Sequence, residues 1–557
     1  MRLTREELHE ILVPPGHVSE EDFSRAAERA ERDGTTIEET LVGANLISEK
    51  NLSYAIAGAR DYIPADLESV SFPDELLALI PEIVARAQEA VIFEQDGTVL
   101  RMATTNPDNY EFIKLLEKRT GLTVKPFYAS IVGIREALRS YKGNIKKELE
   151  ERIKAAHNEE EDAISIVNLL LEYAYSNRAS DIHIEPLEET VTVRFRIDGV
   201  LHRVIEYPKV LHEKIIFRIK ILSRLRTDEH AAAQDGRFDH QLSGTTFDVR
   251  VSIMPVTNGE NAVMRLLVNN AGRLSLEELG LRGRDLEVVH DALSKTQGMI
   301  LSVGPTGSGK TTTLYSLLQI LNKPEVNIMT IEDPVEYDIE HIQQTQVNAN
   351  KNLTFATGLR SIVRQDPDII MVGEIRDDET ADIAVNAAMT GHLLLSTLHT
   401  NDAATTFPRL MEMGVEPFLV ASSIRIIISQ RLVRKVCDAC KSSYLICDDD
   451  QEIINHNEEV GVYLQEITRS EHLGEIRMYR GMGCKACGNT GYSGRTGIFE
   501  VLEVNEEIRT LIANKTSSEI ITEAARKHGL IPVLYNGIEK ALEGITTLEE
   551  VLRVSKA

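Results

Sequence analysis

The sequence predicts a multidomain α/β protein whose later part contains a mostly parallel sheet with helices on both faces. The chain has 557 residues, of which 42% are hydrophobic and 27% charged, enough apolar material for several globular cores. The short apolar runs GMILSVG, VNIMTIED, DIIMVGE and HLLLSTLHT alternate with helical segments, which is typical of parallel sheets. A glycine-rich loop separates the first of these runs from a helix.

The composition argues against several classes of function. The sequence contains no stretch of about 18 apolar residues, so we expect no membrane-spanning helix, and its start, MRLTREELHE, lacks the apolar core of a signal peptide. We therefore expect a cytoplasmic protein that associates with a membrane only through partners. The formal net charge of −26 argues against direct contact with nucleic acid, because such binding needs a basic surface.

Residues 1–141 form the first predicted domain, a docking module that begins with small helical units. A weak duplication relates ILVPPGHVSEEDFSRAAERA to TLVGANLISEKNLSYAIAGA, and each copy predicts a turn followed by a helix capped by serine. The following residues mix strand-like and helical runs and predict a small α/β lobe. Residues 142–163 are highly charged with almost no apolar face, which predicts a solvated helix or linker.

Residues 164–272 form a second predicted α/β domain, in which a helix precedes alternating strands. In VTVRFRIDGV the odd-numbered residues from Val191 to Ile197 face one way, whereas Arg194 and Arg196 face the other. Three further parts complete the predicted organisation. They are the sheet-bearing core at residues 273–435, a four-cysteine insertion at residues 436–490 and a helical region at residues 491–557.

The glycine-rich loop, GPTGSGKT, matches the phosphate-binding pattern G-x-x-x-x-G-K-[ST] in full. It lies between the strand MILSV and the helix TTTLYSLLQIL, which is the context that the motif requires. Backbone N–H groups of such a loop surround phosphates, Lys310 would neutralise the β- and γ-phosphates, and Thr311 would offer a hydroxyl to Mg²⁺. The predicted nucleotide-binding residues of this segment are Gly304, Pro305, Thr306, Gly307, Ser308, Gly309, Lys310, Thr311 and Thr312.

Two groups of carboxylates follow other strand-like runs. Glu374 ends DIIMVGE, and because ligands bind at the carboxyl edge of a parallel sheet, it is a candidate to position or deprotonate the attacking water. The alternative is a carboxylate that only caps the next helix. Glu332, Asp333 and Glu336 follow VNIMTI, and the latter two could reach Mg²⁺ through water or could cap the following segment.

His392 and His399 bracket the run LLLSTL. They are seven residues apart, so within one strand they would point to opposite faces and would not form a metal pair. One of them can face the γ-phosphate while the other bonds the backbone.

Four of the five cysteines form two C-x-x-C units, Cys437 with Cys440 and Cys484 with Cys487. In a cytosolic chain this spacing favours metal over disulfide, and four thiolates can close a tetrahedral, structural Zn²⁺ site. The alternative is four reduced thiols without metal. We expect Cys447 to be an ordinary semi-buried cysteine.

Taken together, these motifs resemble the secretion ATPase superfamily, and within it the type II secretion ATPases and type IV pilus extension ATPases. GPTGSGKTTT resembles Walker A, TIEDPVEY the Asp box, RQDPDIIMVGEIRD Walker B and TGHLLLSTLHTND the His box, and ASDIHIEP, RFRIDGVL, QDGRF and GRTGIFEVL also match. The resemblance is strong over residues 160–557 and weak before them. It implies a P-loop (RecA-like) NTPase core, a preceding domain that covers the nucleotide, ATP and Mg²⁺ at the site, and structural Zn²⁺.

The resemblance also implies roles for single residues. Glu374 resembles the catalytic glutamate and His399 the histidine that senses the γ-phosphate, and Lys310 and Glu336 complete the expected catalytic set. An arginine would stabilise transition-state charge on the phosphoryl group, although arginines on a strand can also be a solvated face. The remaining expected binding residues are Glu332, Asp333, His392, Arg194, Arg196, Arg237, Arg250, Arg360 and Arg364.

The implied function is that of a homohexameric motor that hydrolyses ATP to assemble type IV pili or type II secretion pseudopili, with an inner-membrane platform protein and cytoplasmic assembly proteins as partners. The alternatives are a nucleotide-dependent docking scaffold with slow turnover and the motor of a DNA-uptake pilus. Some relatives bind a cyclic dinucleotide through a repeated R-L-G-x-x-L pattern. The comparable stretch here, DGTTIEETL, lacks the arginine and the glycine of that triplet, so we expect docking to a membrane-associated partner instead.

Overall fold

The computed structural model describes residues 4–33, 36–43, 46–67, 72–77, 79–138, 141–156, 160–242, 245–267, 274–447, 451, 454, 456–484 and 487–555. The chain divides into two compact units, Met1–Val268 and Asn269–Ala557. The domain boundary predicted at residue 272 lies outside the described residues, as do Gly34 and Thr35 of the stretch DGTTIEETL.

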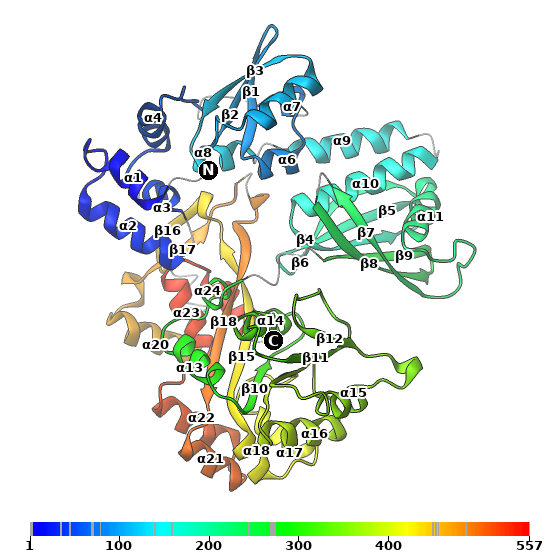
Figure 1. Ribbon diagram of the computed structural model, residues 1–557, viewed down its shortest axis with the longest axis vertical. Coiled ribbons are helices and arrows are strands. Elements are labelled where there is room, and N and C mark those ends of the chain that lie inside the picture. The colour runs from blue at the N-terminus through cyan, green and yellow to red at the C-terminus, as the bar shows by residue number, and fades with distance from the viewer. Residues whose placement is uncertain are drawn as a thin grey trace. The chain divides into compact units, whose positions relative to one another are not determined.

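The first unit begins with a small helical module (Figure 1). Its helices are α1 (Arg5–Leu12), α2 (Glu20–Asp33), α3 (Ile37–Gly43) and α4 (Glu49–Ala59). Ser48 caps α4 by accepting a hydrogen bond from the Asn51 N–H, and the Ser19 hydroxyl accepts one from the Asp22 N–H at the start of α2. The predicted serine caps are confirmed, and the two repeats share one apolar core.

A small α/β lobe follows, as the sequence predicts. Its sheet has the order β1-β2-β3, with an antiparallel first pair and a parallel second pair. The elements are α5 (Asp74–Leu77), α6 (Glu82–Ala87), β1 (Ala90–Asp96), β2 (Val99–Thr104), α7 (Tyr110–Thr120), β3 (Thr123–Tyr128) and α8 (Ile131–Ala137). Helices and strands of this lobe enclose a core of their own.

The charged segment after this lobe forms the helix α9 (Tyr141–Ala155), and this helix is packed rather than solvated. Leu149 is fully buried, and Ile145 and Ile153 are nearly so. Leu149 and Ile153 belong to the core that α10 (Glu160–Ser176) shares with the following sheet. The expectation of a solvated helix is therefore wrong, because apolar residues at i, i+4 and i+8 make a narrow stripe that the surrounding charges obscure.

Six antiparallel strands follow α10 in the order β6-β5-β4-β9-β8-β7. They are β4 (Ala179–Pro186), β5 (Thr190–Ile197), β6 (Val200–Pro208), β7 (Gln234–Leu242), β8 (Thr245–Val256) and β9 (Gly259–Leu267). Helices α10 and α11 (His212–Leu222) pack against one face of this sheet. Val191, Val193 and Phe195 are fully buried there, as their alternation predicts.

The second unit contains a seven-stranded sheet with the order β12-β11-β13-β14-β10-β15-β18. The strands are β10 (Gly298–Val303), β11 (Ile328–Glu332), β12 (Gln343–Gln346), β13 (Ile369–Val372), β14 (Leu393–Leu398), β15 (Ile424–Val436) and β18 (Tyr492–Glu503). All pairs are parallel except β15 with β18. The predicted mostly parallel sheet is thus confirmed.

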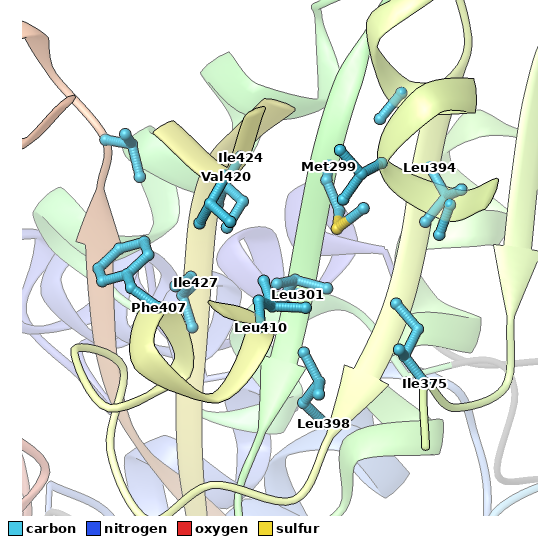
Figure 2. Packing of buried hydrophobic residues seen from close by; sticks show 14 of the residues in the cluster. Met299, Leu301, Ile375, Leu394, Leu398, Phe407, Leu410, Val420, Ile424 and Ile427 are labelled. Atoms are coloured by element: carbon cyan, nitrogen blue, oxygen red, sulfur yellow. The ribbon is translucent and has the colours of Figure 1, made fainter. Parts of the chain in front are cut away.

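Helices cover both faces of this sheet. One face carries α15 (Phe355–Ile362), α16 (Asp378–Met389), α17 (Thr406–Glu412) and α18 (Pro417–Ser423), and the other carries α12 (Leu276–Leu279), α13 (Gly283–Leu293) and α14 (Lys310–Leu321). Alternation along β10 explains this arrangement, since Met299 and Leu301 belong to the first core and Ile300 to the second. Figure 2 shows the first core, where Met299 and Leu301 lie between Leu394 of β14 and Ile427 of β15.

The chain beyond β15 forms a two-stranded ribbon and then a helical end. The ribbon consists of β16 (Lys441–Leu445) and β17 (Arg477–Gly481), with α20 (Glu458–Thr468) between them in sequence. The last helices are α21 (Glu506–Ala513), α22 (Ser518–Lys527), α23 (Val533–Leu542) and α24 (Leu548–Ser555). Within the ranges given above, no helix combines the length and the apolar character that crossing a bilayer requires.

Replacing Leu301 by Ala tests whether the core under β10 holds the sheet together. Leu301 is fully buried, so truncation should lower the free energy of unfolding of the second unit by about 2–5 kcal/mol. The measurement is hydrogen exchange of the β10 and β14 amides in increasing urea. Leu445→Ala is the matched control, because Leu445 is 53% exposed and its truncation should leave these amides protected. Equal loss of protection in both variants would contradict this account of the core.

Candidate functional site

Four central strands of the second unit end at one edge of its sheet, and predicted functional residues follow each end. The strands are neighbours in the order β11-β13-β14-β10 and are parallel. Asp333 directly follows β11, Glu374 lies just beyond β13, His399 directly follows β14 and Gly304 directly follows β10. Ligands of parallel α/β sheets bind at this edge, so the structure gathers these residues where the sequence analysis expects them.

The loop between β10 and α14 has the backbone of a phosphate cradle. Gly304 has a φ of +143° and Gly309 a φ of +93°, values that favour glycine. A Cβ at position 304 would lie 2.6 Å from the backbone oxygen of Gln430, so no larger residue fits. Helix α14 begins at Lys310, and its N-terminal N–H groups and dipole favour an anion in the loop.

The side chains of the loop differ in their access to solvent. Pro305 and Thr312 are half-buried, Ser308 is buried, and Thr306 and Thr311 are exposed. Thr311 lies in the first turn of α14 and is exposed, which is compatible with the predicted Mg²⁺ contact. Binding of a nucleotide and of Mg²⁺ by these residues stays a prediction.

Lys310 is 8% exposed, and its ammonium group is held by the loop itself. Its Nζ donates to the backbone oxygens of Gly304 at 2.8 Å and Pro305 at 3.1 Å. Burial lowers the pKa of Lys310 to about 8; the charge of Glu374 opposes this shift and that of Arg431 adds to it. Since an anion close by stabilises the charged form, a phosphate in the loop would raise this pKa again.

Glu374 is 9% exposed and lies between two basic groups. Its Oε2 is 2.6 Å from Nε of Arg376 and 3.6 Å from Nε2 of His399. Burial and the positive charges of Lys310 and Arg376 lower the pKa of His399, although Glu374 opposes them. The imidazole is therefore mostly neutral at pH 7 and can donate one hydrogen bond and accept another. Arg376 was not among the predicted site residues, although it lies only two residues after Glu374.

The alternative role of Glu374 as a helix cap is not seen. The next helix, α16, is capped by Asp377, whose side chain accepts a hydrogen bond from the Thr380 N–H. The carboxylate of Glu374 is thus available for chemistry at the sheet edge.

Glu332 ends β11, and its carboxylate is enclosed in a buried network. It is 3% exposed and accepts hydrogen bonds from the hydroxyls of Tyr315 and Thr330 and, at 3.2 Å, from the side-chain amide of Gln344. Because Tyr315 lies on α14, this network ties the Asp box to the helix that follows the P-loop. The structure therefore gives Glu332 a packing role, and its contact with nucleotide stays a prediction.

Asp333 and Glu336 follow this network in the chain. Asp333 is exposed at the sheet edge and Glu336 is half-buried. The backbone N–H of Glu336 donates to the hydroxyl of Tyr315 at 3.3 Å, which fixes the segment. An exposed carboxylate at this edge fits the prediction that Asp333 reaches Mg²⁺ through water.

The two histidines lie at opposite ends of β14, since His392 precedes the strand and His399 follows it. His392 makes a backbone contact, with Nδ1 3.0 Å from the carbonyl oxygen of Ala387. This fits the expectation that one histidine bonds the backbone. The structure does not bring His392 to the P-loop edge, where it was expected to bind nucleotide, because it lies at the opposite end of β14.

Arg360 and Arg364 lie on or just after α15 and have local partners. Arg360 forms an ion pair with Glu379 of α16, and Arg364 donates to the hydroxyl of Ser361 at 3.4 Å. Contact of either arginine with a nucleotide stays a prediction.

Three of the predicted arginines of the first unit belong to a row across its six-stranded sheet. Direct cross-strand neighbours in this row are Arg237, Arg250, Arg265, Asp181 and Arg196. Asp181 lies 2.9 Å from Nε of Arg265 and 3.6 Å from Nε of Arg196. Asp239 and Asp248 are direct partners two residues further along the same face, so the row lies among carboxylates, and contact of its arginines with a nucleotide stays a prediction.

The fourth predicted arginine of this sheet, Arg194, is paired with Glu185 on the neighbouring strand. Arg265 was missed by the sequence analysis. Arg265 could have been found from the pairing of the run AVMRLL with DVRVSI, because this pairing places Arg265 opposite Arg250. Strand partners of this kind become visible only once the register is known.

The four paired cysteines converge on one point. The Sγ atoms of Cys437, Cys440, Cys484 and Cys487 all lie within 4.8 Å of one another. Separations of 3.9 Å for Cys437–Cys484 and for Cys440–Cys487 suit four ligands around one ion. Burial raises the pKa of Cys437 and of Cys440, whereas the N–H groups of Cys484 and Gly491 outweigh burial at Cys487 and lower its pKa to about 6. The convergence of the four Sγ atoms is therefore the observation that supports a metal site.

Cys447 lies outside this cluster and is exposed. The expectation that it is semi-buried is wrong, because the neighbouring Ile446 is the residue that enters the core, whereas Cys447 is exposed.

Comparison with known families matches two models to the chain. The model described as Type II/IV secretion system protein matches residues 156–553, and the MshEN domain matches residues 60–148. The first match contains the P-loop, Glu374, His399 and the four clustered cysteines.

Curated relatives match over most of the chain. The type IV pilus assembly ATPase PilB of Myxococcus xanthus is 39% identical, with 98% of each chain covered. The type II secretion system protein E of Pseudomonas aeruginosa is 46% identical over 72% of this chain and 77% of its own.

Among solved structures, the ATPase DotB of Legionella pneumophila shares the fold. It is 22% identical, covers 70% of this chain and 95% of its own, and has a TM-score of 0.51. The predicted fold class, a P-loop core with a preceding α/β domain, and the predicted family are confirmed by these matches. The chain belongs to the family of type II/IV secretion system proteins.

Proposed function

We propose that this chain is an ATPase that hydrolyses ATP at the edge of the seven-stranded sheet and powers assembly of a type IV pilus or a type II secretion pseudopilus. The observation that carries the proposal is the grouping of the P-loop, Glu374 and His399 at the ends of three adjacent parallel strands. The relatives named as a pilus assembly ATPase and a type II secretion protein support the biological setting.

The chemistry is attack of water on the γ-phosphate, with the protein supplying position and charge. Lys310 exchanges the carbonyl oxygens of its own loop for phosphate oxygens. Glu374 orients the water or removes its proton, and neutral His399 lies 3.6 Å from that carboxylate, where it can sense the γ-phosphate. Glu336 belongs to the proposed catalytic set as well.

Magnesium would be held by the hydroxyl of Thr311 and, through water, by Asp333, since oxygen donors are the ligands that this ion prefers. When bound, it neutralises charge on the phosphates. The arginine row of the first unit, Arg360 and Arg364 remain candidates for the arginine that stabilises the transition state.

The proposed assembly is a homohexamer that passes its movement to an inner-membrane platform protein and to cytoplasmic assembly proteins. Nucleotide contacts that differ between two states of a subunit would supply that movement. Within this scheme residues 1–141 dock partners, and the six-stranded domain within residues 164–272 covers the nucleotide. Membrane association arises through these partners. A slow docking scaffold is not favoured, because Glu374 and His399 are both present and grouped at the P-loop.

Replacing Glu374 by Gln is the main test of the ATPase proposal. The change removes the base but keeps the size of the side chain, so kcat should fall roughly 10²–10⁴-fold while nucleotide still binds. Steady-state phosphate release from the purified chain with its membrane partner measures this. Glu506→Gln is the matched control, since Glu506 is a surface residue with an 89% exposed side chain. A docking scaffold would lose little ATPase activity in either variant, and that result would contradict the proposal.

The depressed pKa of Lys310 predicts how nucleotide affinity depends on pH. The folded pKa of about 8 lies below the ordinary value of 10.5, so in the free protein the positive charge is lost as pH rises through 8. Affinity for ADP should therefore decrease between pH 7 and pH 9.5, as measured by fluorescence titration. In Lys310→Arg the charge persists over this range, and the decrease should disappear. A decrease of the same size in Lys310→Arg would assign it to another group.

The cysteine cluster predicts one structural zinc ion per chain. Metal analysis of purified protein should find about one zinc per chain, and Cys437→Ser should lose it and melt at a lower temperature. Cys447→Ser is the control and should retain the metal, because this cysteine lies outside the cluster. Wild-type protein without zinc that melts as sharply as protein supplied with zinc would argue against the site.

A further inference from the structure

Strand β15 carries two adjacent side chains, Gln430 and Arg431, beside the P-loop. It runs parallel to β10, with Ser429 opposite Val303. There β10 ends and the chain turns into the loop at Gly304, whereas β15 continues with β18 as its other neighbour. As successive strand residues, Gln430 and Arg431 point to opposite faces of the sheet.

Gln430 holds the P-loop at both of its ends. It is 1% exposed, its Oε1 accepts from the hydroxyl of Ser302 at 3.3 Å, and its Nε2 donates to the carbonyl oxygen of Ser308 at 2.8 Å. Ser302 lies in β10 and Ser308 precedes Gly309 and Lys310, so one amide spans the loop. A Cβ at Gly309 would lie 3.1 Å from this Nε2, which shows how closely the amide packs on the backbone.

Arg431 is a buried cation held by backbone carbonyls. It is 7% exposed, and its Nη1 donates to the oxygen of Gln430 at 3.1 Å while its Nη2 donates to the oxygen of Asn401 at 2.8 Å. Its buried Nε has no acceptor among the described residues. Asn401 lies two residues after His399, so this guanidinium group joins the strand beside the P-loop to the segment that carries the histidine.

The same segment is held a second time by β18. Glu500 is opposite Ser429 and therefore lies on the face of Arg431. Its Oε1 accepts a hydrogen bond from the backbone N–H of Ala403 at 3.0 Å, and it is 7% exposed. The segment after β14 is thus hydrogen-bonded by two neighbouring strands: β15 contacts it at Asn401 through Arg431, and β18 contacts it at Ala403 through Glu500.

We propose that Gln430 and Arg431 are positioning residues for ATP hydrolysis, Gln430 by holding the P-loop and Arg431 by fixing the segment of His399 relative to it. The inference rests on the proposed ATPase function of this site. Each side chain bonds protein atoms and would act through the loop or segment that it holds. Because the two are neighbours on one strand, β15 links the phosphate loop to the segment of the γ-phosphate sensor, in addition to the direct pairing of β10 with β14.

The two residues should affect different kinetic constants. Gln430→Ala should raise KM and weaken ADP binding together, because it frees the loop that binds both nucleotides. Arg431→Lys keeps the charge but cannot reproduce the two-carbonyl fork, so kcat should fall roughly 10- to 100-fold with ADP affinity within about threefold of wild type. Arg425→Lys is the matched control, since Arg425 lies on the same strand and donates to the oxygen of Gln297 at the other end of β10.

A double-mutant cycle with His399→Ala tests whether Arg431 acts through the histidine. Coupled residues are non-additive, so adding Arg431→Lys to His399→Ala should cost little further kcat. The inference would be overturned if the kcat losses of Arg431→Lys and His399→Ala were additive. It would also be overturned if Arg431→Lys lost kcat and ADP affinity equally, or if Arg425→Lys lost as much kcat as Arg431→Lys. If Arg431→Lys does not fold, as judged by thermal melting, Glu500→Leu replaces it. This change removes the acceptor of the Ala403 N–H and should lower kcat at unchanged ADP affinity, and unchanged kcat would overturn the inference.

These readouts separate failure of the inference from failure of the proposed function. If the wild-type chain hydrolyses ATP and Arg431→Lys has the same kcat, the positioning role alone is refuted. A wild-type chain that neither binds nor hydrolyses ATP with its membrane partner present refutes the ATPase proposal itself.

Discussion

The parallel pairing of β10 with β14 and β15 is the constraint on which the site depends. Every residue of β10, β13 and β14 is buried, so the apolar cores on the two faces fix the positions of these strands. Their common direction brings Gly304, Glu374 and His399 to one edge although the sequence separates them widely. The relative positions of the residues at this edge therefore depend on the burial of apolar side chains on both faces of the sheet.

The charged groups at the edge are satisfied by the protein itself. Lys310 donates to carbonyl oxygens of its own loop, and Glu374 is paired with Arg376. In the proposed function a nucleotide replaces these internal partners, which a phosphate can do because it offers several oxygens at the N-terminus of α14. The free and the nucleotide-bound site would then differ in the partners of Lys310 and Glu374, and not in the charges of these two residues.

Local patterns made much of this molecule predictable. The P-loop, the alternating strands and the two C-x-x-C units follow from spacing within short segments. The buried stripe of α9 was missed because few apolar residues lie among many charges. The roles of Arg265, Gln430 and Arg431 depend on strand register and on contacts between residues 30 to 128 positions apart in the sequence, which no local pattern encodes. Burial likewise revealed that Glu332 is enclosed in a network with Tyr315.

Calorimetric titration of a non-hydrolysable ATP analogue with Mg²⁺ tests the central claim most directly. If the loop of the seven-stranded sheet binds the triphosphate through Lys310, wild-type protein should bind the analogue and Lys310→Ala should bind it at least about 100-fold more weakly, as expected for losing a charged hydrogen bond of roughly 3 kcal/mol. Equal affinity of the two proteins would contradict this site for the nucleotide.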